Sequence, residues 1–251
     1  MLSACSSLQL QNYIERPKVS YKSIDVSKIS ADGIVLNPTF NVDNSNGFPV
    51  PINSVNYTLL LNEQTVLAGE TNEIGTLPAN DNKDISLSLD LTKDTLMTLQ
   101  KLLSQNKQLD YQIKGDVNAM GLSVPFEKSA TLYMPEIKIV DFKVTNANFN
   151  QFDMLLSVDI DNQNDFSLPL ENISYSVSSN NQSLFEGNVE NKELGKGKNN
   201  IQLPLTIRPS DMFNNIFSLL LNPNTPLHVE IESPLFSKSY DHNLNIGTYF
   251  K

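Results

Sequence analysis

An internal duplication constrains this chain more than any other feature of its sequence. The stretch VDNSNGFPVPINSVNY at residues 42–57 returns as IDNQNDFSLPLENISY at residues 160–175, which lie 118 positions further on. A period above about 100 residues indicates duplicated domains, because the units of solenoids run to about 20–50 residues. Other identical pairs keep the same spacing: Pro17 and Pro135, Phe48 and Phe166, Gly69 and Gly187.

The duplication predicts a domain order. Residues 1–16, expected to be a tether that carries the remnant of a lipobox motif described below, precede a first domain at residues 17–134 and a second domain at residues 135–251. At 251 residues the chain is long enough for each half to bury a hydrophobic core of its own. We therefore expect two homologous domains in tandem, joined near LYMPEI at residues 132–137.

Apolar and polar residues alternate along several segments of both halves. A period of two places one face of a strand in a core and the other face mainly in water. Such segments, separated by Asn, Gly or Pro, predict an all-β fold of two antiparallel sandwiches. The apolar positions are Ile34, Leu36, Phe40 and Val42 in the first half, and Phe152, Met154, Leu156, Val158 and Ile160 in the second.

One segment in each half has helical spacing instead. Residues 93–106, KDTLMTLQKLLSQN, carry leucines on one helical face behind Asp94 as a plausible N-cap, and residues 209–222, PSDMFNNIFSLLLN, repeat the pattern behind Ser210. We expect each sandwich to carry one short α-helix that closes an open end of its core. A membrane-binding role for the apolar stripe is the less favoured alternative.

The repeated polar phrase predicts a corner between two core strands. Asn and Asp side chains hydrogen-bond backbone groups two residues on, so a segment such as Asn44 to Gly47 can satisfy its own backbone. We expect Phe48 and Phe166 to fold back over the end of each sandwich. Pro51 and Pro169 would stand at the start of the next strand, where a missing N–H costs least.

These phrases resemble the signature of the group 2 late embryogenesis abundant proteins, whose domain is also called WHy (water stress and hypersensitive response). The family pattern is a hydrophobic strand, Asn-Pro-Asn, Phe, and a Pro-led second strand. Both copies here lack the central proline, since Ser45 and Gln163 take its place. The resemblance covers nearly the whole chain after Pro17. It implies immunoglobulin-like or fibronectin III-like sandwiches with one added helix, and a stress or desiccation role.

The only cysteine, Cys5, follows Leu2, Ser3 and Ala4. This order resembles the lipobox of bacterial lipoprotein precursors, in which the cysteine is diacylated and becomes the mature N-terminus. We therefore expect lipid attachment at Cys5, with the polar stretch after it as a tether, and a membrane as partner through the acylated residue. Ser6 resembles the residue that follows the cysteine in lipoproteins sorted to the outer membrane. The expected location is the periplasmic side of that membrane in a bacterial cell envelope.

Charge argues against nucleic acid as a partner. The chain has 18 Lys and Arg against 28 Asp and Glu, a formal net charge of -10, which repels a phosphate backbone unless a local basic patch exists. The densest basic run, Lys192 to Lys198, is interrupted by Gly195 and Gly197 and is typical of a solvated turn. We also expect no membrane-spanning segment, because no apolar run of roughly 18 residues occurs.

No constellation for catalysis is evident. The stretch from Asp159 to Asp165 is superficially similar to a calcium loop, but Asn164 stands where such a loop needs Gly. His228 and His242 fall in or beside predicted strands, where a solvent-facing histidine is the commoner case. The sequence therefore predicts neither an enzyme, nor a catalytic or metal site, nor a cofactor.

Two functions stay open on these grounds. The first is a non-enzymatic, membrane-tethered envelope lipoprotein that binds or protects other molecules. The alternative is a carrier of lipid or another apolar ligand, with the helix as a lid over a cavity lined by Leu99, Leu103 and Phe217. Partners could accordingly be other proteins or lipids.

Overall fold

The computed structural model describes residues 14–72, 74–147, 151–207 and 225–244. They form two compact units. The first comprises the residues up to Asp25, Leu36–Leu89 and Asp110–Thr131; the second comprises Val26–Val35, Asp90–Leu109 and the residues from Leu132 onward. The domain boundary between residues 134 and 135 stays a prediction.

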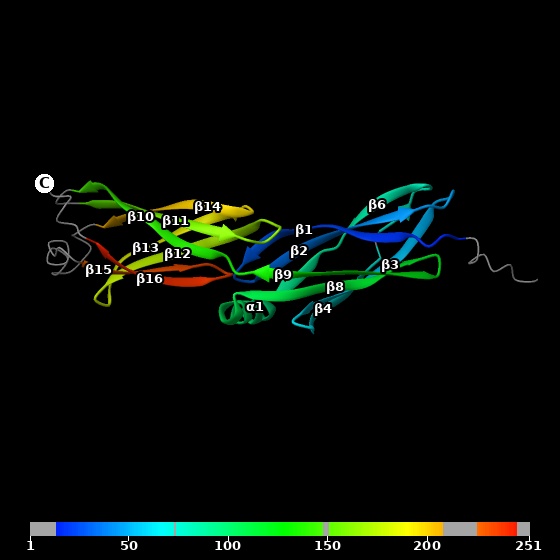
Figure 1. Cartoon of the computed structure of the whole chain (residues 1–251), viewed down its shortest axis with the longest axis horizontal. Coiled ribbons are helices and arrows are strands. Elements are labelled where there is room, and N and C mark those ends of the chain that lie inside the picture. Colours follow the sequence, from blue (N-terminus) through cyan, green and yellow to red (C-terminus); the bar gives the residue numbers. More distant parts are fainter. Residues whose placement is uncertain (1–13, 73, 148–150, 208–224, 245–251) are drawn as a thin grey trace, which may run out of the picture. The chain divides into compact units, whose positions relative to one another are not determined.

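The first sequence copy contains one helix among its strands (Figure 1). Its elements are β1 (Lys18–Ser30), β2 (Gly33–Asn44), β3 (Val50–Leu61), β4 (Gln64–Thr71), β5 (Thr76–Leu77), β6 (Asp81–Ser86), β7 (Leu89–Thr92), α1 (Lys93–Asn106), β8 (Gln108–Ala119) and β9 (Leu122–Tyr133). The second copy contributes β10 (Glu136–Ala147), β11 (Phe152–Asn162), β12 (Leu168–Ser179), β13 (Gln182–Leu194), β14 (Gly197–Ile207), β15 (Thr225–Glu232) and β16 (Ser237–Leu244).

The larger sheet of the first copy is hydrogen-bonded in the order β4-β3-β8-β9, and its smaller sheet contains β1, β2 and β6. Strand β3 lies antiparallel to β4 and to β8, so that Tyr57 stands opposite Gly69 on one side and Gly115 on the other. The Phe40 ring of β2 lies 4.4 Å from the Phe126 ring of β9. Because these rings come from different sheets, their contact places the two sheets face to face.

The second copy repeats the main strands of this arrangement, without a described counterpart of the short strands β5 and β7. Its larger set of strands runs β13-β12-β15-β16 and its smaller sheet β10-β11-β14. A single parallel pair, Ile29 with Leu170, joins β12 to β1, so that the larger set is continuous with β1, β2 and β6. Strands β3 and β12 occupy equivalent positions at the 118-residue offset, and both start one residue before the expected proline, Pro51 or Pro169. The prediction of two tandem antiparallel sandwiches is confirmed.

Alternating residues build the core as expected. On β11 the side chains of Met154, Leu156, Val158 and Ile160 are all buried. Each fully buried aliphatic side chain of this kind contributes about 1.5–3 kcal/mol relative to an exposed one. The two phenylalanines of the repeated phrase differ, however: Phe166 is 5% exposed, as predicted, whereas Phe48 is 39% exposed.

Helix α1 has the expected apolar stripe, with Leu96, Leu99 and Leu103 buried. Its N-cap is Thr92 and not Asp94, which lies in the first turn. The Thr92 side chain makes no capping hydrogen bond. The negative charge of Asp94 in the first turn stabilises the helix by interacting with the positive end of its dipole. The second expected helix, at residues 209–222, lies outside the described residues.

Burial of the α1 stripe bears on the membrane-binding alternative. A leucine that is fully covered by its own protein has no apolar surface left to insert into lipid, and Leu103 is 0% exposed. Among the described residues, no helix is both long enough and apolar enough to cross a bilayer.

Candidate functional site

The repeated polar phrase forms a buried hydrogen-bonded corner. In the second copy, Asn162 is 0% and Asn164 is 5% exposed. The Asn162 side-chain N–H group donates to the Phe166 carbonyl at 2.8 Å, while its Oδ1 accepts from the Asn164 backbone N–H at 3.2 Å and side chain at 2.8 Å. Asn164 also accepts from the Tyr133 N–H at 2.8 Å and donates to the Tyr133 carbonyl at 2.9 Å.

The first copy has the same corner, bond for bond. Asn44 donates to the Phe48 carbonyl at 3.0 Å and accepts from the Asn46 side chain at 2.9 Å. Asn46 exchanges two hydrogen bonds with the backbone of Glu15, at 2.9 and 2.8 Å. Glu15 and Tyr133 are themselves 118 positions apart. The expectation that the Asn side chains would satisfy the corner backbone is therefore confirmed in both copies.

This geometry decides what the corner can do chemically. The amide groups of the buried asparagines are turned toward their own backbone, so they are not presented to a ligand. In the calcium-like stretch, Asp159 accepts a hydrogen bond from the Asn200 side chain at 2.7 Å. Among the described residues there is no group of three or more His, Cys, Asp or Glu placed to hold a metal ion. The repeated phrase therefore stabilises the fold by hydrogen bonding its own backbone and the neighbouring chain.

Both histidines belong to the second copy. His228 on β15 is partly exposed, and its Nδ1 lies 2.8 Å from an Asp241 carboxylate oxygen. His242 on β16 is exposed, and its ring is stacked on the Phe142 ring at 6.0 Å. The prediction of solvent-facing strand histidines is confirmed.

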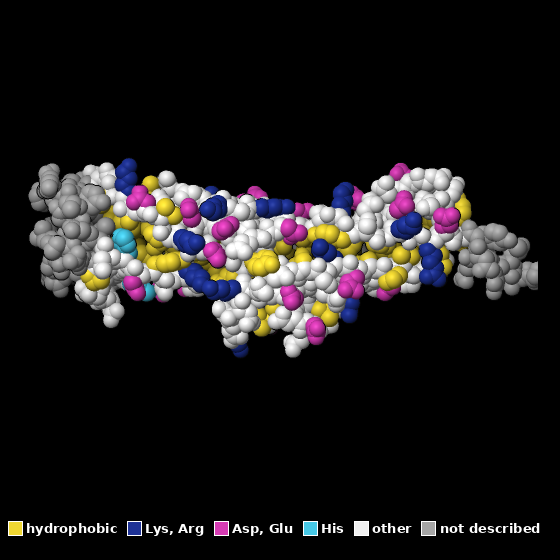
Figure 2. Space-filling view, in the orientation of Figure 1, with side chains coloured by type: hydrophobic (Ala, Val, Ile, Leu, Met, Phe, Trp, Pro, Cys, Tyr) yellow, Lys and Arg dark blue, Asp and Glu magenta, His cyan; other side chains and the backbone are white. Residues whose placement is uncertain are grey.

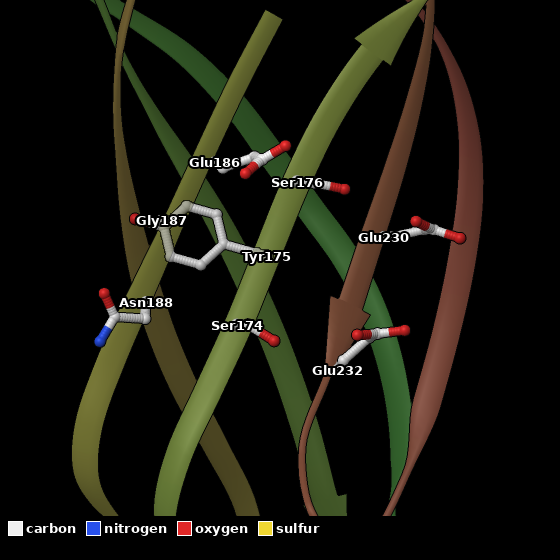
Figure 3. A pocket seen from close by; sticks show the side chains of 8 residues that line it. All are labelled: Ser174, Tyr175, Ser176, Glu186, Gly187, Asn188, Glu230 and Glu232. Atoms are coloured by element: carbon white, nitrogen blue, oxygen red, sulfur yellow. The ribbon is translucent and has the colours of Figure 1, made fainter. Parts of the chain in front are cut away.

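A shallow groove of about 400 Å³ lies on the outer face of β12, β13 and β15. Its lining is polar and acidic, and it offers hydroxyl and carboxylate groups to solvent without a nucleophile and base held together. Figure 3 shows the side chains on their strands: Ser174 and Ser176 on β12, Glu186 and Asn188 on β13, and Glu230 and Glu232 on β15.

Tyr175 and Gly187 also line this groove, with the Tyr175 ring beside Gly187 (Figure 3). Its hydroxyl donates to the Pro204 carbonyl of β14 at 2.7 Å and thereby joins the two sheets. Burial raises the pKa of Tyr175 above the ordinary value of 10.0. Its hydroxyl thus links β12 of one sheet to β14 of the other.

A second cleft, of about 620 Å³, was not foreseen from the sequence. It brings together Lys107, Lys138 and Lys238. These lysines come from three distant segments and form no basic run in the sequence. Only a contact map could have assembled them.

Several predicted residues gain no binding role. Cys5 and Phe217 lie outside the described residues, so lipid attachment at Cys5 stays a prediction. Leu99 and Leu103 are buried in packing and line neither groove described above. Nothing in their placement favours a lipid-carrier cavity.

Comparison with known proteins gives a consistent result. The family model for late embryogenesis abundant protein matches residues 39–130 and 157–235. A desiccation-related protein of Craterostigma plantagineum is 23% identical over 101 residues, which are 40% of this chain and 67% of that protein.

Two solved structures are also similar. One, from Arabidopsis thaliana, has 17% identity and a TM-score of 0.43, covering 48% of this chain and 83% of its own. The other, a late embryogenesis abundant protein, has 16% identity and a TM-score of 0.39. The match covers 51% of this chain and 76% of that protein.

Proposed function

The chain belongs to the late embryogenesis abundant protein family, group 2, with its domain in two tandem copies, and from this premise we propose that it is a non-enzymatic protective protein of the stress or desiccation type. The observation that carries the proposal is the family match in both copies, together with a desiccation-related relative. The family is generally non-enzymatic.

The outer faces of the sheets offer a physical reason why this fold suits drying. Polar side chains there are hydrogen-bonded across strands to one another: Asn41 to Asp84 at 2.8 Å, Gln112 to Glu127 at 2.7 Å, and Asn200 to Asp159 at 2.7 Å. A polar group that already has a protein partner loses less when water is removed than one that depends on water alone. Figure 2 shows charged side chains dispersed among uncharged ones on the face in view.

The second part of the proposal is a lipid tether at Cys5 that holds the protein on the periplasmic side of a bacterial outer membrane. Its support is the Leu2-Ser3-Ala4-Cys5 order, the uniqueness of the cysteine and Ser6 after it. Acyl chains contribute about 0.8 kcal/mol per buried CH₂, and more than one chain makes the attachment durable. The tether would keep the protective domains close to envelope proteins and lipids, their expected partners.

Protection is tested by drying and rehydrating a labile enzyme such as lactate dehydrogenase with the full chain or with an equal mass of serum albumin. More enzyme activity should survive with the full chain than with albumin. Equal survival would refute the protective role.

The tether is tested separately, by intact mass spectrometry of the protein isolated from membranes, with Cys5→Ser as control. A diacylglyceryl-sized mass increase should be present in the natural protein and absent from the variant. An unmodified Cys5 would refute the tether and leave the protective role standing.

A further inference from the structure

The lysine cleft lies wholly within the second compact unit. Three segments line it: the end of α1 with the start of β8, the chain that leads into β10, and β16. The corner between β11 and β12 adds a fourth wall through Gln163. The charged and amide side chains that line the cleft are Lys107, Lys138, Lys238, Glu136, Gln108 and Gln163.

Hydrogen bonds hold these segments together. The Lys107 carbonyl accepts from the Met134 N–H at 2.8 Å, and the Lys107 N–H donates to Leu103 at 2.7 Å. The Tyr240 hydroxyl donates to the Ile137 carbonyl. Gln163 directly precedes Asn164, whose side chain is bonded to Tyr133. The cleft is therefore built on fixed backbone and does not depend on the lysine side chains for its shape.

The charge of the cleft is opposite to that of the chain. Three lysines face it against one carboxylate, Glu136, in a chain with a net charge of -10. Glu136 lies 3.6 Å from Lys138, but both side chains are more than half exposed, so this pair is weak. Among the described residues, neither Lys107 nor Lys238 forms an ion pair. Their charges remain available to an anion.

The floor of the cleft strengthens this field. Met134, Pro135 and Ile137 line it and are buried. Charges beside a low-dielectric wall attract a counter-charge more strongly than charges surrounded by water. Gln108 and Gln163, whose amides are neutral N–H donors, also line the cleft.

The first copy does not repeat the cleft. At the 118-residue offset, Lys138 corresponds to Ser20 and Gln163 to Ser45, while Glu136 corresponds to Lys18. Duplication therefore does not explain Lys138, because the equivalent strand of the first copy forms with Ser20 in its place.

We propose that the cleft formed by Lys107, Lys138 and Lys238 binds a phosphate group, carried either by a soluble phosphate compound or by a lipid headgroup. Lysine serves as a point charge for phosphate, and convergence from three segments supplies a multiple contact that a single exposed lysine cannot. The volume of about 620 Å³ admits a phosphate with part of the molecule that bears it.

The test compares two triple variants of the full chain that lose the same charge. K107Q/K138Q/K238Q removes the cleft lysines, and K101Q/K114Q/K198Q removes exposed lysines elsewhere. Binding of inorganic pyrophosphate is measured by calorimetry at low ionic strength in chloride buffer. Binding of vesicles is measured by co-sedimentation, with phosphatidylglycerol and phosphatidylcholine in equal parts or phosphatidylcholine alone. Circular dichroism confirms that both variants are folded.

The cleft variant should bind pyrophosphate about tenfold or more weakly than the natural chain, and the control variant within about twofold of it. Loss of pyrophosphate binding alone assigns the site to soluble phosphates. Loss of binding to phosphatidylglycerol vesicles, with or without loss of pyrophosphate binding, assigns it to lipid headgroups. The proposal is overturned if the natural chain binds neither probe, or if both triple variants lose binding equally.

Discussion

The side-chain amide of Asn164 and the backbone of Tyr133 exchange a reciprocal pair of hydrogen bonds, with N···O distances of 2.8 and 2.9 Å. The side chain therefore takes the place of a neighbouring strand. It fixes the chain two residues before Pro135, just ahead of β10, which starts at Glu136. Asn46 holds Glu15 in the same way in the first copy. One buried asparagine in each copy thus ties the start of the domain to the corner of its sheets.

We expect Asn164→Ala to lower the free energy of unfolding by about 2 kcal/mol, because the partly buried N–H and carbonyl groups of Tyr133 lose their side-chain partner and Asn162 Oδ1 keeps only the Asn164 backbone N–H. Asp165→Ala, at the exposed next position, should change it by no more than about 0.5 kcal/mol. Urea unfolding followed by circular dichroism measures both. Equal stability of the two variants would contradict the structural role of the corner.

Gly115 is expected to be intolerant of a side chain. A Cβ there would meet the Asn56 carbonyl oxygen at 1.9 Å and the Phe126 ring at 2.7 Å. Because the oxygen belongs to the paired strand and cannot move alone, Gly115→Ala should cost about 3 kcal/mol in unfolding free energy.

Gly47→Ala is the matched control, since its Cβ would meet nothing within 4 Å. Thermal unfolding should give a clearly lower midpoint for Gly115→Ala and an unchanged midpoint for Gly47→Ala. A normal midpoint for the Gly115 variant would mean that β3 and β8 lie further apart than described here.

Tyr175→Phe removes the hydroxyl that joins β12 to β14, so we expect it to cost about 1 kcal/mol near neutral pH. Tyr57, its counterpart, is half-buried, and Tyr57→Phe is the comparison variant. Chemical unfolding of both at pH 7 tests the difference. A larger loss for Tyr57→Phe would contradict the proposed joining role of Tyr175.

Alkaline pH gives Tyr175 a second signature. Burial raises its pKa in the folded chain above 10.0, so the unfolded chain loses this proton first as the pH rises. The stability that Tyr175 contributes to the folded chain is therefore fully present below about pH 10, and it is lost as the pH rises through the pKa of Tyr175 in the folded chain. Tyr175→Phe should show a shallower decline of unfolding free energy between pH 9 and 11 than the natural chain. An unchanged slope would contradict the pKa shift.

Asp84 should influence how the stability of the protein falls at acidic pH. Hydrogen bonds from Asn41, and then the Lys22 ammonium, hold the pKa of this exposed carboxyl below its usual 3.8. The unfolded chain therefore takes up the proton first as the pH falls, and the stability that Asp84 contributes is lost as the pH drops through the folded pKa. Asp84→Asn should lose less stability between pH 5 and 2 than the natural chain. An identical acid profile for the two proteins would contradict this prediction.

The sequence was sufficient for most of the fold because its patterns are local. Alternation along residues 152–160 identified a strand with one buried face, and leucine spacing identified α1. Two details failed: the helix cap, placed at Asp94 and found at Thr92, and the covering position expected of Phe48, which is exposed. Cap positions depend on backbone dihedrals of single residues, which composition does not specify.

The sequence by itself determined the architecture, because local alternation within each copy predicts its strands and the in-register repeat predicts that the same domain occurs twice. Tertiary structure alone decided the sites. About 30 residues separate Lys107 from Lys138, and about 100 separate Lys138 from Lys238. Only the packing of the end of α1 with β10 and β16 brings the three charges to one cleft. Charge acts through space, so its pattern along the chain does not reveal where it converges.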